Sequence, residues 1–269
     1  MAQPAYICAA SYDSFTTVNS DVDDILDRLD TVLAAAGWTV AAPGGPYTTP
    51  ADADGRYFKL TFTRVSATRL SCVMTDDQLR ATGSRGMEIT GVQTINLYYS
   101  TKYLYIVNTG QEDTIYATLL SLYPESETIH RNYCVFFGTR ETAGWARNNY
   151  ICGNNIQVRA DTGAYLTQGN PTTYTFLDYG SEGGSNWCTA TRHASGARRW
   201  YPVWTLGQDG SSVYRLRGRY YNALIMHYSW VTIGTEYTVP IDEATTAVFK
   251  VLNMTQNTNN QYYMAVRKS

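Results

Sequence analysis

The sequence predicts a mainly β protein, built from sandwich-like or barrel-like antiparallel sheets, with one N-terminal amphipathic helix packed on a sheet. Short apolar runs alternate with Gly-, Asn- and Thr-rich breaks along most of the chain, which is typical of strands joined by turns. Tyr, which favours strands, occurs 23 times in 269 residues, beside 21 Gly. We expect a single β-rich domain over residues 1–269, with a loop-rich insertion at about 139–210.

One segment has a clear helical period. Apolar residues recur at helical spacing in SDVDDILDRLDTVLAAAG, which begins at Ser20. Ser20 is the expected N-cap and Asp23 occupies the capping-box position. Gly37 is expected to end the helix in the left-handed conformation, with Trp38 packing back on Leu33. The apolar face then lies on a sheet.

The strands around this helix are short. Residues 1–18 suggest a lead-in strand or extended arm, and residues 41–55 a loop rich in Pro and Gly. Tyr57–Val65 alternates as a half-exposed strand does, and Arg69–Met74 is its expected hairpin partner. Asp76–Gly91 is polar and contains Gly, which predicts a surface loop.

The centre of the fold is expected at Tyr103–Gly138. Three apolar strands, Tyr103–Val107, Thr114–Tyr123 and Tyr133–Phe137, are separated by two polar breaks. Apolar residues occupy both alternating faces, which is typical of a strand covered on both sides in the middle of a sheet. The faces are predicted as Leu104, Ile106, Ile115, Ala117 and Leu119 on one side, and Tyr105, Val107, Tyr116, Leu120 and Leu122 on the other.

Beyond the centre the composition changes and then returns to strand patterning. Residues 139–150 are polar, 151–159 suggest a strand pair, and 163–210 are dominated by Gly, Ser, Thr and Asn with interspersed aromatic residues. Val213–Trp230 predicts a long strand with a possible break at Asn222. Three closing strands are expected at Glu236–Val239, Thr246–Asn253 and Gln261–Val266.

Charge and cysteine content limit the function classes. The net charge of −2 gives no long-range attraction for nucleic acid or an anionic membrane. No stretch has the pattern of a signal peptide or the length of a membrane helix. An odd number of cysteines without CxxC pairs favours reduced core thiols over a disulfide framework. These are Cys8, Cys72, Cys134, Cys152 and Cys188.

No catalytic or metal motif is present, so we expect no enzyme, no metal and no cofactor. The histidines are isolated and lack metal-ligand spacing, and no GxSxG elbow accompanies the serines near His193. The Gly-rich segment 180–185 lacks the Lys of a phosphate-binding loop. Acids for glycoside hydrolysis exist at Asp161, Asp178 and Glu182, but any loop-rich β protein supplies such acids.

A basic and aromatic group of residues is the most suggestive surface. It consists of Arg192, Arg198, Arg199, Trp200, Arg215, Arg217 and Arg219. In a strand, Arg215, Arg217 and Arg219 alternate onto one face. This face is either a docking surface for an acidic partner or a solvated strand face. The aromatic residues of 163–204 fit an interface or stacking on sugar rings.

The order of elements resembles a family of tailed-bacteriophage virion proteins. The shared features are the central block Tyr103–Gly138, the helix ending in Gly-Trp at Ser20–Trp38, a strand like Arg56–Val65 and a closing strand like Tyr262–Val266. The resemblance does not extend to residues 139–210. It implies a structural component of the neck, the collar or elsewhere on the tail, and it carries no active-site residues.

On this resemblance, the expected partners are other virion proteins and copies of the chain itself, in a ring around the head–tail axis. The expected location is the virion, assembled in the bacterial cytoplasm, without membrane or specific nucleic-acid binding. A host-adsorption module that binds surface saccharide, such as a tail fibre or spike, is the alternative. A depolymerase is a third class.

Overall fold

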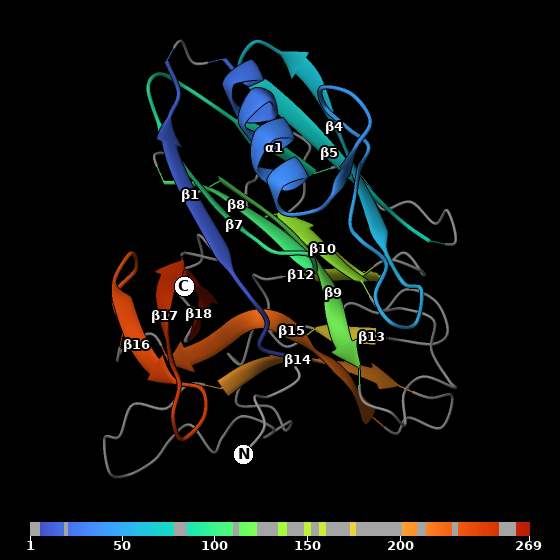
Figure 1. The fold of residues 1–269 in the computed structure, drawn as a ribbon, viewed down its shortest axis with the longest axis vertical. Coiled ribbons are helices and arrows are strands. Elements are labelled where there is room, and N and C mark those ends of the chain that lie inside the picture. The colour runs from blue at the N-terminus through green and yellow to red at the C-terminus, as the bar shows by residue number, and fades with distance from the viewer. Residues whose placement is uncertain are drawn as a thin grey trace.

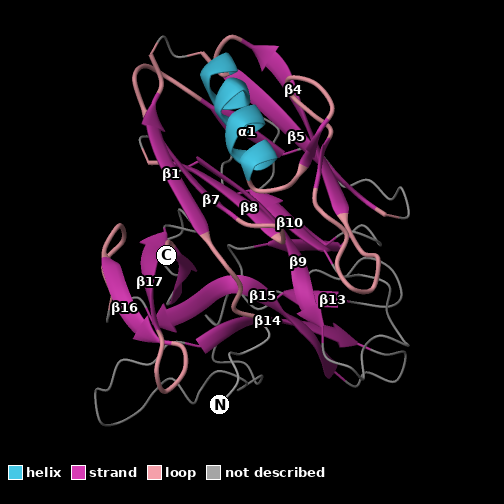
Figure 2. Cartoon of the chain, viewed as in Figure 1, coloured by secondary structure: helices cyan, strands magenta, loops and turns pink. Residues whose placement is uncertain are grey.

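The computed structural model describes residues 6–18, 21–77, 85–109, 113–122, 134–138, 148–151, 156–159, 173–175, 201–208, 214–227, 231–252 and 262–269. Within these ranges the chain forms antiparallel β-sheets and one α-helix (Figure 1, Figure 2), which confirms the mainly β prediction. Hydrophobic clusters cover both faces of the central strands of the larger sheet.

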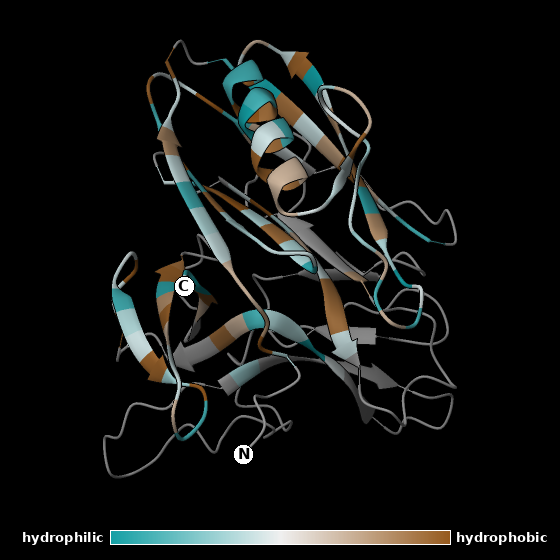
Figure 3. Ribbon diagram, viewed as in Figure 1, coloured by the Kyte–Doolittle hydropathy of each residue, from teal (hydrophilic) through white to brown (hydrophobic). Residues whose placement is uncertain are grey.

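The smaller sheet and the helix form one layer of the molecule. The sheet has the order β2-β3-β4-β5-β6, with β2 at Thr39–Val40, β3 at Tyr47–Thr48, β4 at Phe58–Ser66, β5 at Arg69–Asp76 and β6 at Arg85–Glu88. Helix α1 spans Asp23–Ala35. Figure 3 shows both hydrophilic and hydrophobic residues around α1, as expected for an amphipathic helix. Its apolar residues are buried in one cluster with those of β4 and β5.

The larger sheet has the main order β1-β7-β8-β9-β15-β18-β17-β16. These strands are β1 Ser11–Thr16, β7 Thr94–Tyr99, β8 Tyr103–Asn108, β9 Asp113–Leu122, β15 Tyr214–His227, β18 Tyr262–Arg267, β17 Thr246–Leu252 and β16 Glu236–Pro240. Branching from β9 are β10 Cys134–Gly138, β11 Asn148–Ile151 and β12 Ile156–Arg159, and from β15 are β14 Tyr201–Gln208 and β13 Thr173–Thr175. The sheet curls into a half-barrel (Figure 1).

The curl depends on β15, which pairs with different strands along its length. Its first part pairs with β9 at Gly218–Tyr220, and its last part pairs with β18 from Ala223 onward. Gly218 permits the close approach to β9, because an added Cβ would lie 2.7 Å from the Ser121 carbonyl oxygen. Asn222, between the two parts, has a φ of 53°. The possible break at Asn222 is not a gap in the strand, because β15 continues through this residue; its left-handed φ marks the place where the pairing changes from β9 to β18.

Both faces of β8 are buried, as predicted for the centre of a sheet. All six of its residues are buried, and β8 lies between β7 and β9. The face carrying Leu104 and Ile106 packs under α1 and the smaller sheet, whereas the face carrying Tyr105 and Val107 lines the inside of the curl. The inner face is rich in tyrosine, and burial raises the pKa of Tyr98, Tyr103, Tyr105 and Tyr116 well above the ordinary value.

The C-terminal end of α1 forms as predicted. Gly37 has a φ of 85°, in the left-handed region that glycine adopts without strain. The Trp38 N–H donates to the Leu33 carbonyl at 2.9 Å, and the Gly37 N–H donates to the Ala34 carbonyl at 3.0 Å, the pattern of a Schellman motif. The buried Trp38 indole also donates to the Ser100 carbonyl at 2.7 Å, which ties the helix end to the larger sheet.

The start of α1 differs in detail from the prediction. Ser20, the predicted N-cap, lies outside the described residues. Asp21 Oδ1 accepts a hydrogen bond from the Asp23 N–H at 3.0 Å, so the Asp21 side chain satisfies one free amide of the first turn. The Asp23 carboxylate, expected in a capping box, accepts a hydrogen bond from Arg64 Nη1 at 2.6 Å. This ion pair joins the start of the helix to β4.

Two segments predicted as loops contain strands. β6 lies within Asp76–Gly91 and pairs with β5, and the neighbouring Ile89 is fully buried. β3 lies within residues 41–55 and pairs with β4. Its Tyr47 is fully buried, and the hydroxyl donates to Asp30 Oδ1 at 2.5 Å. The surface loop predicted at Asp76–Gly91 and the loop predicted at 41–55 were wrong at these positions, because a short stretch of each segment pairs with a neighbouring strand.

The remaining predictions for strands and cysteines are largely confirmed. β4 and β5 form the expected hairpin. The strand pair expected at 151–159 begins earlier, because β11 at Asn148–Ile151 lies mostly in the segment predicted as a polar excursion, and only β12 lies within the expected range. Cys72 and Cys134 are free and buried, and Cys8 is free and half-buried. Cys152 and Cys188 lie outside the described residues, as does most of the predicted insertion at 139–210.

Candidate functional site

Much of the predicted basic surface lies outside the described part of the chain. Arg192, Arg198, Arg199 and Trp200 are not described, nor are most of the aromatic residues of 163–204. The predicted interface role of these residues and the alternative of sugar stacking therefore stay predictions. The three remaining arginines lie on β15.

Arg215, Arg217 and Arg219 do not follow one uninterrupted alternation. In the register with β14, Leu216 faces Leu206 and Gly218 faces Thr205, so Arg217 is the additional residue of a β-bulge. A bulge of this kind changes the direction of the strand and interrupts the two-residue period. The premise that all three arginines share one face is thus not supported by the backbone.

Arg219 packs against its own chain. Its guanidinium carbon lies 4.9 Å from the centre of the Tyr6 ring, a cation–π contact between β15 and the segment that precedes β1. The Arg219 side chain is half-buried in this position. Arg219 therefore helps to hold residues 6–8 on the sheet, whatever further contact it makes with another subunit.

Asn222 fixes the same N-terminal segment through its amide. Its Oδ1 accepts a hydrogen bond from the Cys8 N–H at 3.0 Å, and its Nδ2 donates to the Cys8 carbonyl at 2.9 Å. The same Nδ2 lies 2.9 Å from the Tyr103 hydroxyl, and the Asn222 N–H donates to the Tyr6 carbonyl at 2.9 Å. Asn222 is fully buried. Its side chain thus supplies the hydrogen bonds that strand pairing would otherwise give to the backbone of residues 6–8, whose N–H and C=O groups would be left unsatisfied without it.

The larger sheet ends in two strands, β1 and β16, each paired on one side only within the described ranges. The middle of β1 is covered by a charged pair: the Asp13 carboxylate accepts hydrogen bonds from two guanidinium nitrogens of Arg28 on α1. The hydrogen bonds from Arg28, with a further one from the Ser14 N–H, hold the pKa of Asp13 below its usual value. An inward charge of this kind protects an edge strand against pairing.

β16 has a more accessible edge. The hydrogen bonds at its two ends join odd-numbered residues to β17: the Ile241 N–H donates to the Thr245 carbonyl, and the Val251 N–H donates to the Thr235 carbonyl. Antiparallel pairing alternates, so the even-numbered residues direct their backbone groups away from β17. Thr238, in the middle of β16, is exposed and directs its N–H outward. Within β16 the outward N–H groups are those of Glu236 and Thr238, because Pro240 has none, and these groups can pair with a further strand.

A contact across the curl lies close to both edges. Lys268 Nζ donates to Glu236 Oε1 at 2.8 Å on β16, and it lies 4.5 Å from the centre of the Tyr12 ring on β1. The hydrogen bond to Glu236 raises the pKa of Lys268. The Tyr12 ring in turn packs against the Tyr98 ring at a tilt of 48°, with ring centres 5.1 Å apart, and the Tyr12 hydroxyl donates to Asn96 Oδ1 at 2.7 Å. The ends of the open sheet are thus joined by side chains.

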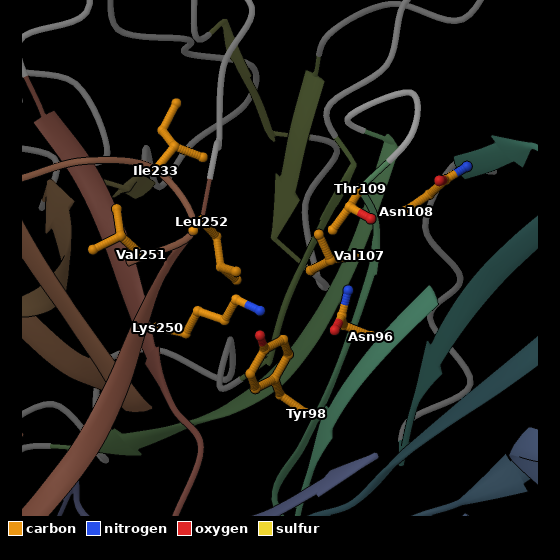
Figure 4. Close-up of a pocket in the computed structure, with 10 residues that line it drawn as sticks. Asn96, Tyr98, Val107, Asn108, Thr109, Ile233, Lys250, Val251 and Leu252 are labelled. Carbon is orange, nitrogen blue, oxygen red and sulfur yellow. The ribbon is translucent and has the colours of Figure 1, made fainter. Parts of the chain in front are cut away.

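Beside this contact the curl encloses a pocket of about 200 Å³ (Figure 4). β7 and β8 form one wall, and β17 with the turn before β16 forms the other. The pocket is lined by Asn96, Tyr98, Val107, Asn108, Thr109, Ile233, Gly234, Lys250, Val251 and Leu252. Most of the surface is apolar, and Figure 4 shows the Lys250 ammonium and the Tyr98 hydroxyl directed toward one another.

The sequence analysis did not single out any residue of this pocket. Two signals were present: Asn96 interrupts the apolar run TINLYY, and Lys250 stands between the buried Phe249 and Val251. A polar residue inside an apolar strand is also found on any half-exposed strand. The pocket could not be recognised before the curl brought β7 and β17 together.

Comparison with known proteins does not assign this chain to a family. No family model matches the sequence, and no curated protein matches it. Within the described ranges, no group of three or more His, Cys, Asp or Glu side chains could hold a metal ion. In the same part of the chain, no helix combines the length and the apolar character needed to cross a membrane.

Proposed function

We propose that this protein is a structural component of a tailed-bacteriophage particle, a neck, collar or tail-associated protein present in several copies around the head–tail axis. Its role is to bind other virion proteins and its own copies, without catalysis and without a cofactor. The resemblance of the central block, the helix ending in Gly-Trp and the closing strand supports this proposal. We also propose that the complete chain is one sandwich-like or barrel-like domain.

The observation that carries the proposal is the open edge of β16. A curled sheet that does not close leaves a row of backbone donors and acceptors at its end, and such an edge is a template for a strand from another chain. Strand addition at an edge is a common way for subunits to join. The exposed Thr238 N–H on β16 provides a donor for this pairing.

The basic surface is the second contact in this proposal. Arg192, Arg198, Arg199 and Trp200, with Arg215 and Arg217 on β15, are proposed to contact a neighbouring subunit. Arg and Trp are enriched at such contacts because they combine a large contact area with directed hydrogen bonds. Arg219 is left out of this proposed contact because it packs on Tyr6 of the same chain.

A substitution on the free edge of β16 tests the proposal. Thr238→Pro removes the outward N–H and leaves the hydrogen bonds to β17 in place, since proline is tolerated where the missing N–H faces away from the partner strand. We expect self-association, measured by light scattering over a concentration series, to weaken about tenfold, because the N–H at the centre of the edge is lost and its partner carbonyl is left unsatisfied. Incorporation into phage particles should fall in parallel.

Thr238→Val is the matched control, because it changes the same side chain and keeps the N–H. It should associate and incorporate like the wild type. Circular dichroism and thermal unfolding of both variants establish that the fold is kept. If a folded Thr238→Pro variant associates at wild-type concentrations, the edge of β16 is not the contact.

A further inference from the structure

The pocket inside the curl has the position and size of a small-ligand site. It lies beside the end of β8, where Asn108 and Thr109 line it, and the mouths of β-barrels are common positions for such sites. Its volume of about 200 Å³ exceeds that of an apolar protein cavity of about 150 Å³ that holds one benzene molecule. A ligand of six to ten non-hydrogen atoms, roughly, would therefore fit.

The walls of the pocket divide into an apolar part and a polar end. Val107 and Leu252 are buried on opposite walls, and Ile233 at the rim is 42% exposed, unusual for a large apolar side chain. Such exposure is consistent with a surface that an apolar ligand covers. The polar end is formed by Tyr98 and Lys250 (Figure 4).

The polar atoms at this end are donors without a protein acceptor. The Tyr98 hydroxyl is buried and makes no hydrogen bond within the described residues. Burial raises the pKa of Tyr98 above its ordinary value, so the hydroxyl keeps its proton at any physiological pH. Asn96 Oδ1 already accepts from Tyr12, which leaves its amide N–H groups for another acceptor. A buried donor left without an acceptor is destabilising, so a bound acceptor is favoured.

The net charge around this end is one positive charge, from Lys250 and Lys268 against Glu236, whose carboxylate adds to the raised pKa of Tyr98. Lys250 forms no ion pair in the part of the chain that the structure describes, although Glu236 faces it in the register of β16 and β17. Glu236 is engaged by Lys268 at 2.8 Å. One unpaired cation in a largely apolar pocket matches a ligand with one negative charge. A phosphate dianion would leave part of its charge uncompensated and poorly solvated.

We propose that this pocket binds a small carboxylic acid, with its carboxylate at Lys250 and Tyr98 and its apolar chain between Val107 and Leu252. The site goes beyond the proposed structural role and does not depend on it. Binding there would make the half-barrel responsive to a small amphiphilic anion. The bound chain would also join the β7–β8 wall to β17 directly across the pocket.

Calorimetric titration of the full chain with hexanoate tests the site. The wild type should bind hexanoate, and should bind the neutral, equal-sized hexanamide at least about tenfold more weakly, because a charge-assisted hydrogen bond is lost. Lys250→Met keeps the apolar stem and removes the charge, so it should reduce hexanoate affinity about tenfold or more. Tyr98→Phe should reduce it about 2- to 10-fold.

The variants separate this site from unspecific binding. Lys59→Met, on β4 in the smaller sheet, removes a lysine far from the pocket residues in the chain and should leave hexanoate affinity unchanged. Thermal unfolding of each variant shows whether the fold is kept. Equal hexanoate affinity of wild type and a folded Lys250→Met variant would overturn the proposal, as would equal binding of hexanoate and hexanamide or no hexanoate binding at all.

Discussion

At the scale of single residues, Asn222 combines two roles that no other residue type fills as well. Its φ of 53° lies in the left-handed region, which asparagine tolerates better than other side chains except glycine. Its amide contacts both backbone groups of Cys8 and the Tyr103 hydroxyl. Glycine would satisfy the backbone but not the hydrogen bonds, and alanine would satisfy neither.

This difference can be measured by replacing Asn222 with glycine and with alanine. Asn222→Gly should lower the free energy of unfolding by about 2–3 kcal/mol, because buried partners lose their hydrogen bonds. Asn222→Ala should lower it by about 1 kcal/mol more, the cost of a left-handed backbone with a Cβ. Urea unfolding of the three proteins gives both values. Equal stability of the two variants would show that the backbone conformation contributes nothing.

At the scale of elements, β1 is attached to α1 through Asp13 and Arg28. The Arg28 side chain is 42% exposed, so water screens its attraction to Asp13. This pair should therefore stabilise the fold by no more than about 1 kcal/mol. The pKa of Asp13 is lowered in the folded state. Its contribution is therefore present above the unfolded pKa of about 4 and is lost as the pH falls through the lower folded value.

Asp13→Asn removes this pH dependence and keeps an acceptor at the same place. The wild type should be more stable than Asp13→Asn at pH 7, and the difference should shrink as the pH is lowered below about 4. Denaturant unfolding at several pH values measures it. Asp27→Asn, on the exposed side of α1, is the control for a change of net charge. A difference that stays constant down to pH 2 would contradict the role of Asp13.

The elements also show how far sequence patterns reach. The helix that ends at Gly37 and the doubly buried strand β8 were predicted because their signals are local, a 3.6-residue period and apolar residues on both faces. β3 and β6 were missed because they are held by neighbours that the sequence does not place. Tyr47 is buried by pairing with β4 and by Asp30, both distant from the local pattern.

The candidate site was less accessible to sequence reasoning than the fold. Asn96 on β7 and Lys250 on β17 are more than 150 residues apart in the sequence. Their walls are connected through the pairing of β8, β9, β15, β18 and β17, which no local pattern predicts. The arginines of β15 were predicted to alternate on one face, but a bulge at Arg217 is a property of pairing with β14. Neither feature follows from the spacing of residue types.

At the scale of the whole molecule, the half-barrel is held together by contacts between distant parts of the chain. Residues 6–8, the bend at Asn222 and the end of β18 meet at one point. The Cys8 carbonyl accepts hydrogen bonds from Asn222 Nδ2 and from Arg267 Nη1, both at 2.9 Å. Lys268 then connects β1 with β16. The shape of the curl therefore depends on a few polar contacts as well as on its tyrosine-rich core.

The shared carbonyl of Cys8 predicts coupling between Asn222 and Arg267. Asn222→Gly leaves the carbonyl bonded to Arg267, and Arg267→Met leaves it bonded to Asn222. The double variant leaves the half-buried Cys8 carbonyl without either donor, so its loss of unfolding free energy should exceed the sum of the single losses by about 0.5–1 kcal/mol. Urea unfolding of the four proteins measures this coupling energy.

Lys268→Met combined with Asn222→Gly is the control, because Lys268 contacts Glu236 and Tyr12 and should give additive losses. Additive losses for Asn222 and Arg267 as well would mean that the two side chains stabilise the curl independently, and that the Cys8 carbonyl is not the point at which its ends are joined.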